Sequence, residues 1–81
     1  MADKLRITNN LRKLRFFAGE MTQQELAEKA GVSRQTIISI EAGKYSPSLE
    51  LAFRLANAFH VKIGEVFDCE AIPTADLNDR R

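Results

Sequence analysis

A run of polar side chains between Ser33 and Ser39 carries hydrogen-bonding groups at helical spacing. Its donors and acceptors are Arg34, Gln35, Thr36 and Ser39. An arginine can donate two hydrogen bonds to guanine, and a glutamine can pair with the acceptor and donor of adenine. Ile38 lies among them, where it would touch a thymine methyl group or stay exposed, whereas Ile37 and Ile40 recur on the core-facing side. These residue types predict a surface that contacts the edges of DNA bases.

Two short helices, from Thr22 to Glu41, are expected to hold this surface. Thr22 with Glu25 three residues later is a capping-box pattern, which begins a helix. Gly31 tolerates the left-handed backbone conformation that ends a helix abruptly, and Ser33 can cap the helix that follows. Two capped helices this close together predict a helix-turn-helix, whose second helix enters the major groove of DNA.

Contacts to the phosphate backbone are expected on both sides of the polar run. The free N–H groups and positive dipole end at the start of the first motif helix suit a phosphate. The predicted phosphate contacts are Thr22, Gln23, Ser33, Lys44, Tyr45 and Arg12. The simpler alternative is that these residues only form the solvated surface of an ordinary small α-helical domain.

The segment before the motif predicts a short strand and one helix. Residues 3–7 alternate polar and apolar side chains, as a strand does. Thr8 is a candidate cap for the helix after it, and Gly19 ends that helix. Its buried stripe is expected to consist of Leu11, Leu14 and Phe17 or Ala18. Phe16 and Phe17 are adjacent and cannot both face the core, so we expect one of them to cover a neighbouring surface.

The segment after the motif predicts a fourth helix, which starts at Ser46 or Ser48. Five apolar residues fall on one face of this helix: Leu49, Ala52, Leu55, Ala56 and Phe59. Leu51 and Phe53 lie off that face and are expected to be partly exposed. A short fifth helix at about 63–67 and an extended stretch at 67–72 complete the predicted order of elements.

Length and charge set the frame for these elements. At 81 residues the chain has room for one domain, predicted over residues 1–73, with a polar flexible tail at 74–81. The formal net charge is only +1, but residues 1–47 hold eight basic against five acidic side chains. The half that contains the motif is therefore the basic half, which favours a polyanionic partner.

Composition argues against several other classes of protein. The single cysteine, Cys69, excludes an internal disulfide and fits a reducing compartment. No apolar run is long enough for a membrane span, and the first residues lack the apolar core of a signal peptide, so we expect a cytoplasmic protein. Without HExxH, paired CxxC, a phosphate-binding glycine loop or GxSxG, we expect no enzymatic activity, cofactor or metal site.

The whole pattern resembles the Cro/repressor-type, or Xre, family over about residues 9–67. The resemblance rests on LRKLR, TQQELAEKAGVSRQTIISIEAGKYSPSLELAFRLANAF and IGEVF, in this order and spacing. It implies a mainly α fold, a five-helix lambda-repressor-like DNA-binding domain. Small stand-alone members are homodimers that add a two-stranded antiparallel sheet, which here implies pairing of residues 3–7 with about 67–72. The family also implies an ion pair between Arg15 and Glu41.

Residues and resemblance together predict a sequence-specific transcriptional regulator that binds double-stranded DNA. We expect a repressor that binds a palindromic operator as a homodimer, with no small-molecule ligand and no membrane partner. The predicted dimer surface consists of Leu51, Phe59, Val66, Phe67 and Cys69. The alternative is a protein-interaction module, such as an antitoxin or adaptor, that binds through Phe16, Phe17 and the C-terminal extension. A third class, a ligand sensor, would lack a separate effector domain.

Overall fold

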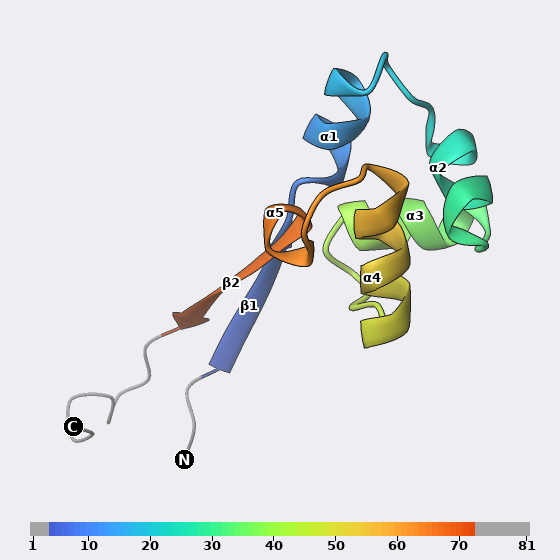
Figure 1. Cartoon of the computed structure of the whole chain (residues 1–81). Helices are drawn as coiled ribbons and strands as arrows, with labels where there is room; N and C mark the ends of the chain where they lie inside the picture. Colours follow the sequence, from blue (N-terminus) through green and yellow to red (C-terminus); the bar gives the residue numbers. More distant parts are fainter. Residues whose placement is uncertain (1–3, 73–81) are drawn as a thin grey trace, which may run out of the picture.

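Five helices and two strands follow one another in the computed structural model, which describes residues 4–72 (Figure 1). Residues 1–3 and 73–81 lie outside the described part, and so do the predicted tail and the end of the predicted domain. The elements are β1 (Lys4–Asn9), α1 (Leu11–Phe17), α2 (Gln23–Ala30), α3 (Arg34–Glu41), α4 (Leu49–Ala58), α5 (Ile63–Val66) and β2 (Phe67–Ile72). This order confirms the predicted mainly α fold with a two-stranded sheet.

The helices enclose one hydrophobic core. α2 packs against both α3 and α4, and α4 packs against α5. The largest fully buried side chains are Leu11, Leu26, Ile37, Ile40, Leu55 and Val66. No polar or charged side chain among the described residues is fully buried, so the core itself is apolar. None of the described helices is long and apolar enough to cross a membrane.

The start of α1 differs from the prediction, because Thr8 belongs to β1 and does not cap the helix. Thr8 lies opposite Asp68 in the sheet, and α1 begins three residues later at Leu11. The Oδ1 atom of Asn9 accepts a hydrogen bond from the Leu11 N–H at 3.1 Å. The N–H of Asn10 donates to the Val66 carbonyl at 2.8 Å. Pairing with β2 thus extends the strand past the residue that could have capped a helix.

The buried stripe of α1 is shorter than predicted. Leu11 is buried and Leu14 is half-buried, but Phe17 and Ala18 are exposed. Phe16 and Phe17 expose 62% and 70% of their surface, and their rings meet edge to face with centroids 5.4 Å apart. Neither ring covers a neighbouring element as expected, because α1 ends at Phe17, at the edge of the core.

α4 buries most of the predicted face, with Ala52, Leu55 and Ala56 in the interior, but its first turn differs from the prediction. Ser48 caps the helix by accepting a hydrogen bond from the Leu51 N–H at 3.2 Å. Leu51 is 8% exposed and belongs to the core, whereas Leu49 is 69% exposed. The two leucines have therefore exchanged the predicted roles. Phe53 is 49% exposed, in agreement with the prediction.

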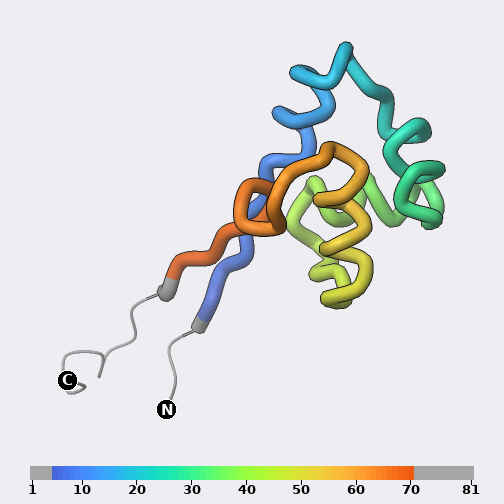
Figure 2. Tube along the Cα trace, in the orientation of Figure 1, coloured from blue at the N-terminus to red at the C-terminus, as the bar shows by residue number. Residues whose placement is uncertain are grey.

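The two strands form an arm that projects from the helices (Figures 1 and 2). We call residues 4–9 and 67–72 the arm. The strands are antiparallel, with Lys4 opposite Ile72 and Asn9 opposite Phe67. This confirms the expected sheet, and β1 is longer by two residues at its C-terminal end than the predicted strand.

The predicted dimer surface is mostly not available on the outside of the molecule. Leu51 and Val66 are buried in the core, at 8% and 0% exposure, so the expectation that they form an exposed apolar surface is wrong. Phe59 and Phe67 are half-buried and pack against the same core. Of the five predicted positions only Cys69 is exposed.

Candidate nucleic-acid interface

The turn between α2 and α3 is built from the predicted capping groups. The Thr22 hydroxyl accepts a hydrogen bond from the Glu25 N–H at 3.0 Å, and the Glu25 carboxylate accepts one from the Thr22 N–H at 2.8 Å. Gly31 ends α2 with a φ of 75°, a conformation that suits glycine. Ser33 then caps α3 by accepting a hydrogen bond from the Thr36 N–H at 3.2 Å. The predicted helix-turn-helix is thus present, with both caps formed.

α3 presents its polar side to solvent and its apolar side to the core. Ile37 and Ile40 are buried at 0% and 1% exposure. Arg34 and Gln35 are exposed, and the other predicted base-contacting residues are half-buried: Thr36, Ile38 and Ser39. The polar side of α3 thus forms a ridge, and a hollow lies on each side of this ridge.

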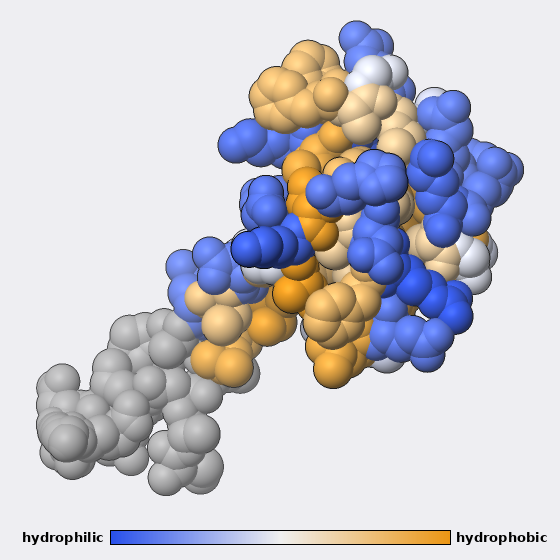
Figure 3. Space-filling model, in the orientation of Figure 1, coloured by the Kyte–Doolittle hydropathy of each residue, from blue (hydrophilic) through white to orange (hydrophobic). Residues whose placement is uncertain are grey.

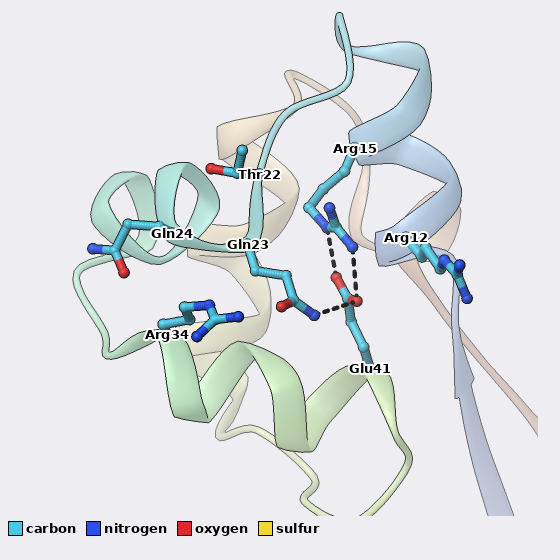
Figure 4. A pocket seen from close by; sticks show the side chains of 7 residues that line it. All are labelled: Arg12, Arg15, Thr22, Gln23, Gln24, Arg34 and Glu41. Carbon is cyan, nitrogen blue, oxygen red and sulfur yellow. Dashed lines mark hydrogen bonds and ion pairs between the residues drawn. The ribbon is translucent and has the colours of Figure 1, made fainter.

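The first hollow lies between α3 and the helices that precede it (Figure 4). It encloses about 500 Å³. Its lining combines three arginines with polar groups from α1, α2 and α3: Arg12, Arg15, Thr22, Gln23, Gln24, Arg34 and Glu41. Four of the predicted DNA contacts, which are Arg12, Thr22, Gln23 and Arg34, are thus brought to one place.

An ion pair ties the first hollow together. The Arg15 Nε donates to one Glu41 carboxylate oxygen at 2.8 Å, and its Nη2 donates to the other at 3.0 Å. The Arg15 Nη1 also donates to the Met21 carbonyl at 2.8 Å. The two charged side chains are only 15% and 10% exposed. The hydrogen bond that Arg15 donates to Glu41 raises the pKa of Arg15, against the lowering effect of burial. The implied Arg15–Glu41 pair is confirmed, and it joins α1 to α3.

Gln23 belongs to the same network, which the sequence did not reveal. Its Nε2 atom donates to the Glu41 carboxylate at 3.2 Å, as the dashed line in Figure 4 marks. An amide nitrogen carries two hydrogens, so one of them remains for another acceptor. Glu41 therefore fixes the orientation of a side chain predicted to contact a phosphate. The signal in the sequence was weak, because Gln23 and Glu41 lie 18 residues apart.

The second hollow lies on the other side of α3 and encloses about 370 Å³. It is lined by Ser33, Gln35, Thr36, Ser39, Lys44 and Tyr45. The hydroxyls of Ser33 and Thr36 share a hydrogen bond of 3.0 Å, so one hydroxyl hydrogen of this pair remains free to donate. All six residues had been assigned to bases or phosphates from the sequence.

Gln24 and Ile38 complete the description of the surface beside α3. Gln24 lines the first hollow beside Gln23, although it is not among the predicted DNA contacts. The sequence did offer one signal for Gln24: it is next to Gln23, a predicted phosphate contact at the start of α2. Ile38 lines neither hollow. Within residues 4–72, no group of three His, Cys, Asp or Glu side chains could hold a metal ion.

The free positive charge beside α3 comes from a few residues. Glu41 neutralises Arg15 through a two-fold hydrogen-bonded pair. Arg12 and Arg34 in the first hollow and Lys44 in the second have no such partner among the ion pairs of the described residues. A ridge of hydrogen-bonding side chains between two positively charged hollows fits a polyanionic duplex, whose backbones run on both sides of a groove.

Comparison with known proteins agrees with this geometry. The chain is 56% identical over 57 residues to the HTH-type transcriptional regulator MJ0272 of Methanocaldococcus jannaschii, a match that covers 68% of this chain and 86% of that protein. It is 44% identical over 59 residues to the HTH-type transcriptional regulator YgzD of Bacillus subtilis, covering 73% and 88% of the two chains.

A phage protein matches as well. The immunity repressor protein of Bacillus phage phi105 is 34% identical over 53 residues, which span 65% of this chain and 37% of the phage protein. The model of the helix-turn-helix family matches residues 11–66, from the start of α1 to the end of α5. The chain therefore belongs to the Xre-type helix-turn-helix family: it is a transcriptional regulator, not an enzyme, and its helix-turn-helix is a DNA-binding domain.

Proposed function

We propose that this regulator is a repressor that binds a palindromic operator as a homodimer, with α3 in the major groove. The observation that carries the proposal is the ridge of α3 between two hollows. Arg34, Gln35, Thr36, Ser39 and Ile38 contact bases. Thr22, Gln23, Ser33, Lys44, Tyr45 and Arg12 contact the phosphates that pass on either side.

Two recognition helices are needed for a useful level of specificity. One α3 offers three or four base contacts, each worth about 1–3 kcal/mol of discrimination. Two copies on half-sites about one helical turn apart bring the total to the range of specific protein–DNA complexes. Such a dimer blocks transcription when its operator overlaps a promoter. The similarity to a phage immunity repressor supports repression. A cytoplasmic location is part of the proposal because the regulator must reach the chromosomal DNA that it binds.

Selection of bound sequences from a random duplex pool tests this proposal. The wild-type protein is expected to enrich a two-fold symmetric sequence. Arg34→Ala and Gln35→Ala are expected to lose the preference at one base pair in each half-site, because a bidentate contact to that base is removed. Asn57→Ala, on the exposed side of α4, is the matched control and keeps the wild-type preference. If both α3 variants kept it as well, α3 would not be the recognition helix.

A second candidate function has one observation in its favour. Phe16 and Phe17 form an exposed aromatic pair at the end of α1, and a protein-interaction module such as an antitoxin or adaptor would use such a surface. Binding to random duplex DNA at increasing salt separates the two functions. A steep fall in affinity indicates phosphate neutralisation, whereas no binding even at low salt favours the interaction module.

A further inference from the structure

A third hollow lies along α1 and encloses about 500 Å³. We call it the aromatic hollow, and it is lined by Asn9, Asn10, Arg12, Lys13, Phe16 and Phe17. Figure 3 shows hydrophobic side chains over α1 at the upper end of the molecule, with hydrophilic side chains directly beside them. Neither phenylalanine is among the proposed base or phosphate contacts, so DNA binding does not explain why both are exposed.

The two phenylalanine rings form one fixed apolar surface. They meet edge to face, with centroids 5.4 Å apart and an interplanar angle of 74°. A phenylalanine side chain presents about 200 Å², so exposed fractions of 62% and 70% leave roughly 250 Å² uncovered. Gly19 and Glu20 follow α1 with left-handed φ values of 79° and 60°, so no further helical turn covers the rings. Because the two rings restrict each other, a partner that packs on them orders little that is mobile.

The positive charges of the aromatic hollow are not neutralised within the described part of the chain. Arg12 and Lys13 are exposed, and neither belongs to an ion pair among residues 4–72. Both asparagines of the hollow, in contrast, donate hydrogen bonds to backbone carbonyls of other elements, at 3.0 and 3.1 Å. The aromatic hollow therefore offers two aromatic rings and two positive charges to a partner.

We infer that the aromatic hollow binds an acidic segment of another protein, in which an apolar or aromatic side chain lies next to Asp or Glu. The apolar side chain packs against Phe16 and Phe17, and the carboxylates pair with Arg12 and Lys13. An arginine suits this role because its guanidinium can donate two parallel hydrogen bonds to one carboxylate. Aromatic and arginine side chains are also the ones that contribute most to binding in protein interfaces.

The combination of charge and aromatic surface favours such a segment over other occupants. A second copy of this chain, packed about a two-fold axis, would bring Arg12 and Lys13 against the same two cations, and like charges oppose binding. A DNA phosphate can pair with the cations but gains nothing from the phenylalanine rings. A membrane surface presents no single side chain that fills a concave site. An acidic segment with an apolar side chain matches both the rings and the cations.

Arg12 connects the aromatic hollow to DNA binding. It also lines the first hollow, where it is a proposed phosphate contact. Figure 4 shows its guanidinium directed away from the Arg15–Glu41 pair. A carboxylate bound to Arg12 occupies a donor that a DNA phosphate needs. The acidic segment and the operator therefore oppose each other, and each lowers the affinity for the other by the same factor. This part of the inference rests on the proposed function, to which it adds a regulating partner.

Selection from a library of random short peptides displayed on phage tests the inference, with the wild-type protein as the target. The peptides that bind are expected to combine Asp or Glu with Phe, Trp or Leu. Their synthetic forms are then titrated without DNA by fluorescence polarisation. Phe16→Ser/Phe17→Ser is expected to raise the peptide Kd by about tenfold or more, and Lys13→Ala raises it by a smaller factor. Lys29→Ala removes an exposed lysine outside the aromatic hollow and is the matched control for Lys13→Ala, with the wild-type Kd.

The affinity for the operator selected from the random duplex pool is the second readout. A saturating peptide is expected to weaken operator binding by the wild type about tenfold, within the usual range of coupling between two sites. The Phe16→Ser/Phe17→Ser variant keeps the wild-type melting temperature and operator affinity, because both rings are exposed. The same peptide concentration leaves its operator affinity unchanged.

Each outcome decides one part of the inference. A selection that enriches no acidic peptides, or peptides whose Kd is the same for the wild type and the Phe16→Ser/Phe17→Ser variant, would overturn it. Operator affinity that is insensitive to bound peptide would overturn the competition at Arg12. Weaker operator binding by a fully folded Phe16→Ser/Phe17→Ser variant would assign the rings to the DNA surface instead. A wild-type protein that binds no duplex would contradict the proposed function, and the titrations without DNA would still decide whether the aromatic hollow binds peptide.

Discussion

At the scale of single residues, Glu41 connects the stability of the domain to its DNA-binding surface. Its carboxylate accepts hydrogen bonds from Arg15 on α1 and from Gln23 on α2, although Glu41 itself ends α3. Three helices thus meet at one side chain, beside the hollow that is proposed to hold a phosphate. A change at this residue acts on folding and on DNA binding together.

Glu41→Ala is expected to lower the free energy of unfolding by about 1–3 kcal/mol, because it leaves the half-buried Arg15 charge without its partner. The affinity for operator DNA falls in the same variant, since Gln23 loses its anchor. Thermal unfolding at fixed protein concentration and a DNA-binding titration measure the two effects. Glu50→Ala removes an exposed ion pair with Arg54 and is the control, with a loss of at most about 0.5 kcal/mol. An unchanged melting temperature for Glu41→Ala would contradict the role assigned to the pair.

The same pair sets a pH dependence. The hydrogen bond with Glu41 raises the pKa of Arg15 in the folded protein, so folding favours the protonated guanidinium. This contribution is fully present below the pKa of an unfolded arginine and is lost only as the pH rises through the still higher folded value. Titration of Arg15 is therefore expected to contribute no change in stability between pH 6 and about pH 9. Unfolding experiments on the wild type and on Arg15→Lys measure the free energy of unfolding in this pH range and at more alkaline pH. Lysine has a lower pKa than arginine, so the variant loses its charge at a lower pH.

Lys44 offers a separate prediction for phosphate contact. Each phosphate neutralised by a basic side chain adds about 0.9 to the slope of log K against log salt concentration. Lys44→Ala is expected to reduce that slope by about 0.9 in magnitude while leaving the preferred sequence unchanged. Lys29→Ala, which removes an exposed lysine at the far end of α2, serves as the control. Equal slopes for the wild type and Lys44→Ala would remove Lys44 from the interface.

At the scale of elements, the turn between α2 and α3 depends on one glycine. Gly31 adopts a φ of 75°, and a Cβ atom there would lie 3.3 Å from the Arg54 Nη1. That guanidinium group approaches the Ala30 carbonyl at the end of α2, with an N–O distance of 3.5 Å. A side chain at position 31 would therefore strain the backbone and push on the group that covers the end of the helix.

Gly31→Ala is expected to destabilise the domain by about 1–2 kcal/mol, the cost of a left-handed conformation for a residue with a Cβ atom. For a domain of this size the melting temperature falls by roughly 5–15 °C. Gly64→Ala in α5 is the control: a Cβ atom there meets nothing within 4 Å, and alanine favours a helix over glycine. A Gly31→Ala variant as stable as Gly64→Ala would contradict this account of the turn.

The elements also show which parts of the fold the sequence could predict. Thr22, Ser33 and Gly31 act on backbone groups within a few residues, so their roles followed from local chemistry. Leu49 and Leu51 could not be assigned in this way, because both fit a helical stripe and only the position of α2 and α5 around α4 selects Leu51. For the same reason Thr8 was misassigned: its partner strand lies 60 residues away.

The candidate site was predicted to a similar extent. The residues that line the second hollow are close neighbours on α3 and in the loop after it, and all six are among the DNA contacts predicted from the sequence. The hydrogen bond from Gln23 to Glu41 joins two helices and required the packed structure. One of Phe16 and Phe17 was likewise expected to cover a neighbouring surface, and only the early end of α1 leaves both exposed.

At the scale of the whole molecule, the proposed homodimer would fix the distance between the two half-sites that it binds. Its two α3 helices are expected to enter successive major grooves on one side of the duplex, about 10 base pairs apart. Insertion of about 5 base pairs between the half-sites turns one of them to the opposite side of the DNA. The affinity then falls to that of a single half-site. Electrophoretic mobility shifts with the native operator, the lengthened operator and a single half-site measure this, and unchanged affinity for the lengthened operator would exclude a fixed dimer.

The arm also determines the order in which this protein can fold as it is synthesised. Lys4 pairs with Ile72, whereas the helices between them pack largely on close neighbours in the chain. Contacts between distant residues form more slowly than local ones, and β1 leaves the ribosome long before β2 exists. At about 5–20 residues per second, β1 waits several seconds for its partner strand. α1 to α4 can therefore form before β2 exists, whereas the core also needs Val66, the residue directly before β2, so the arm is completed together with the core.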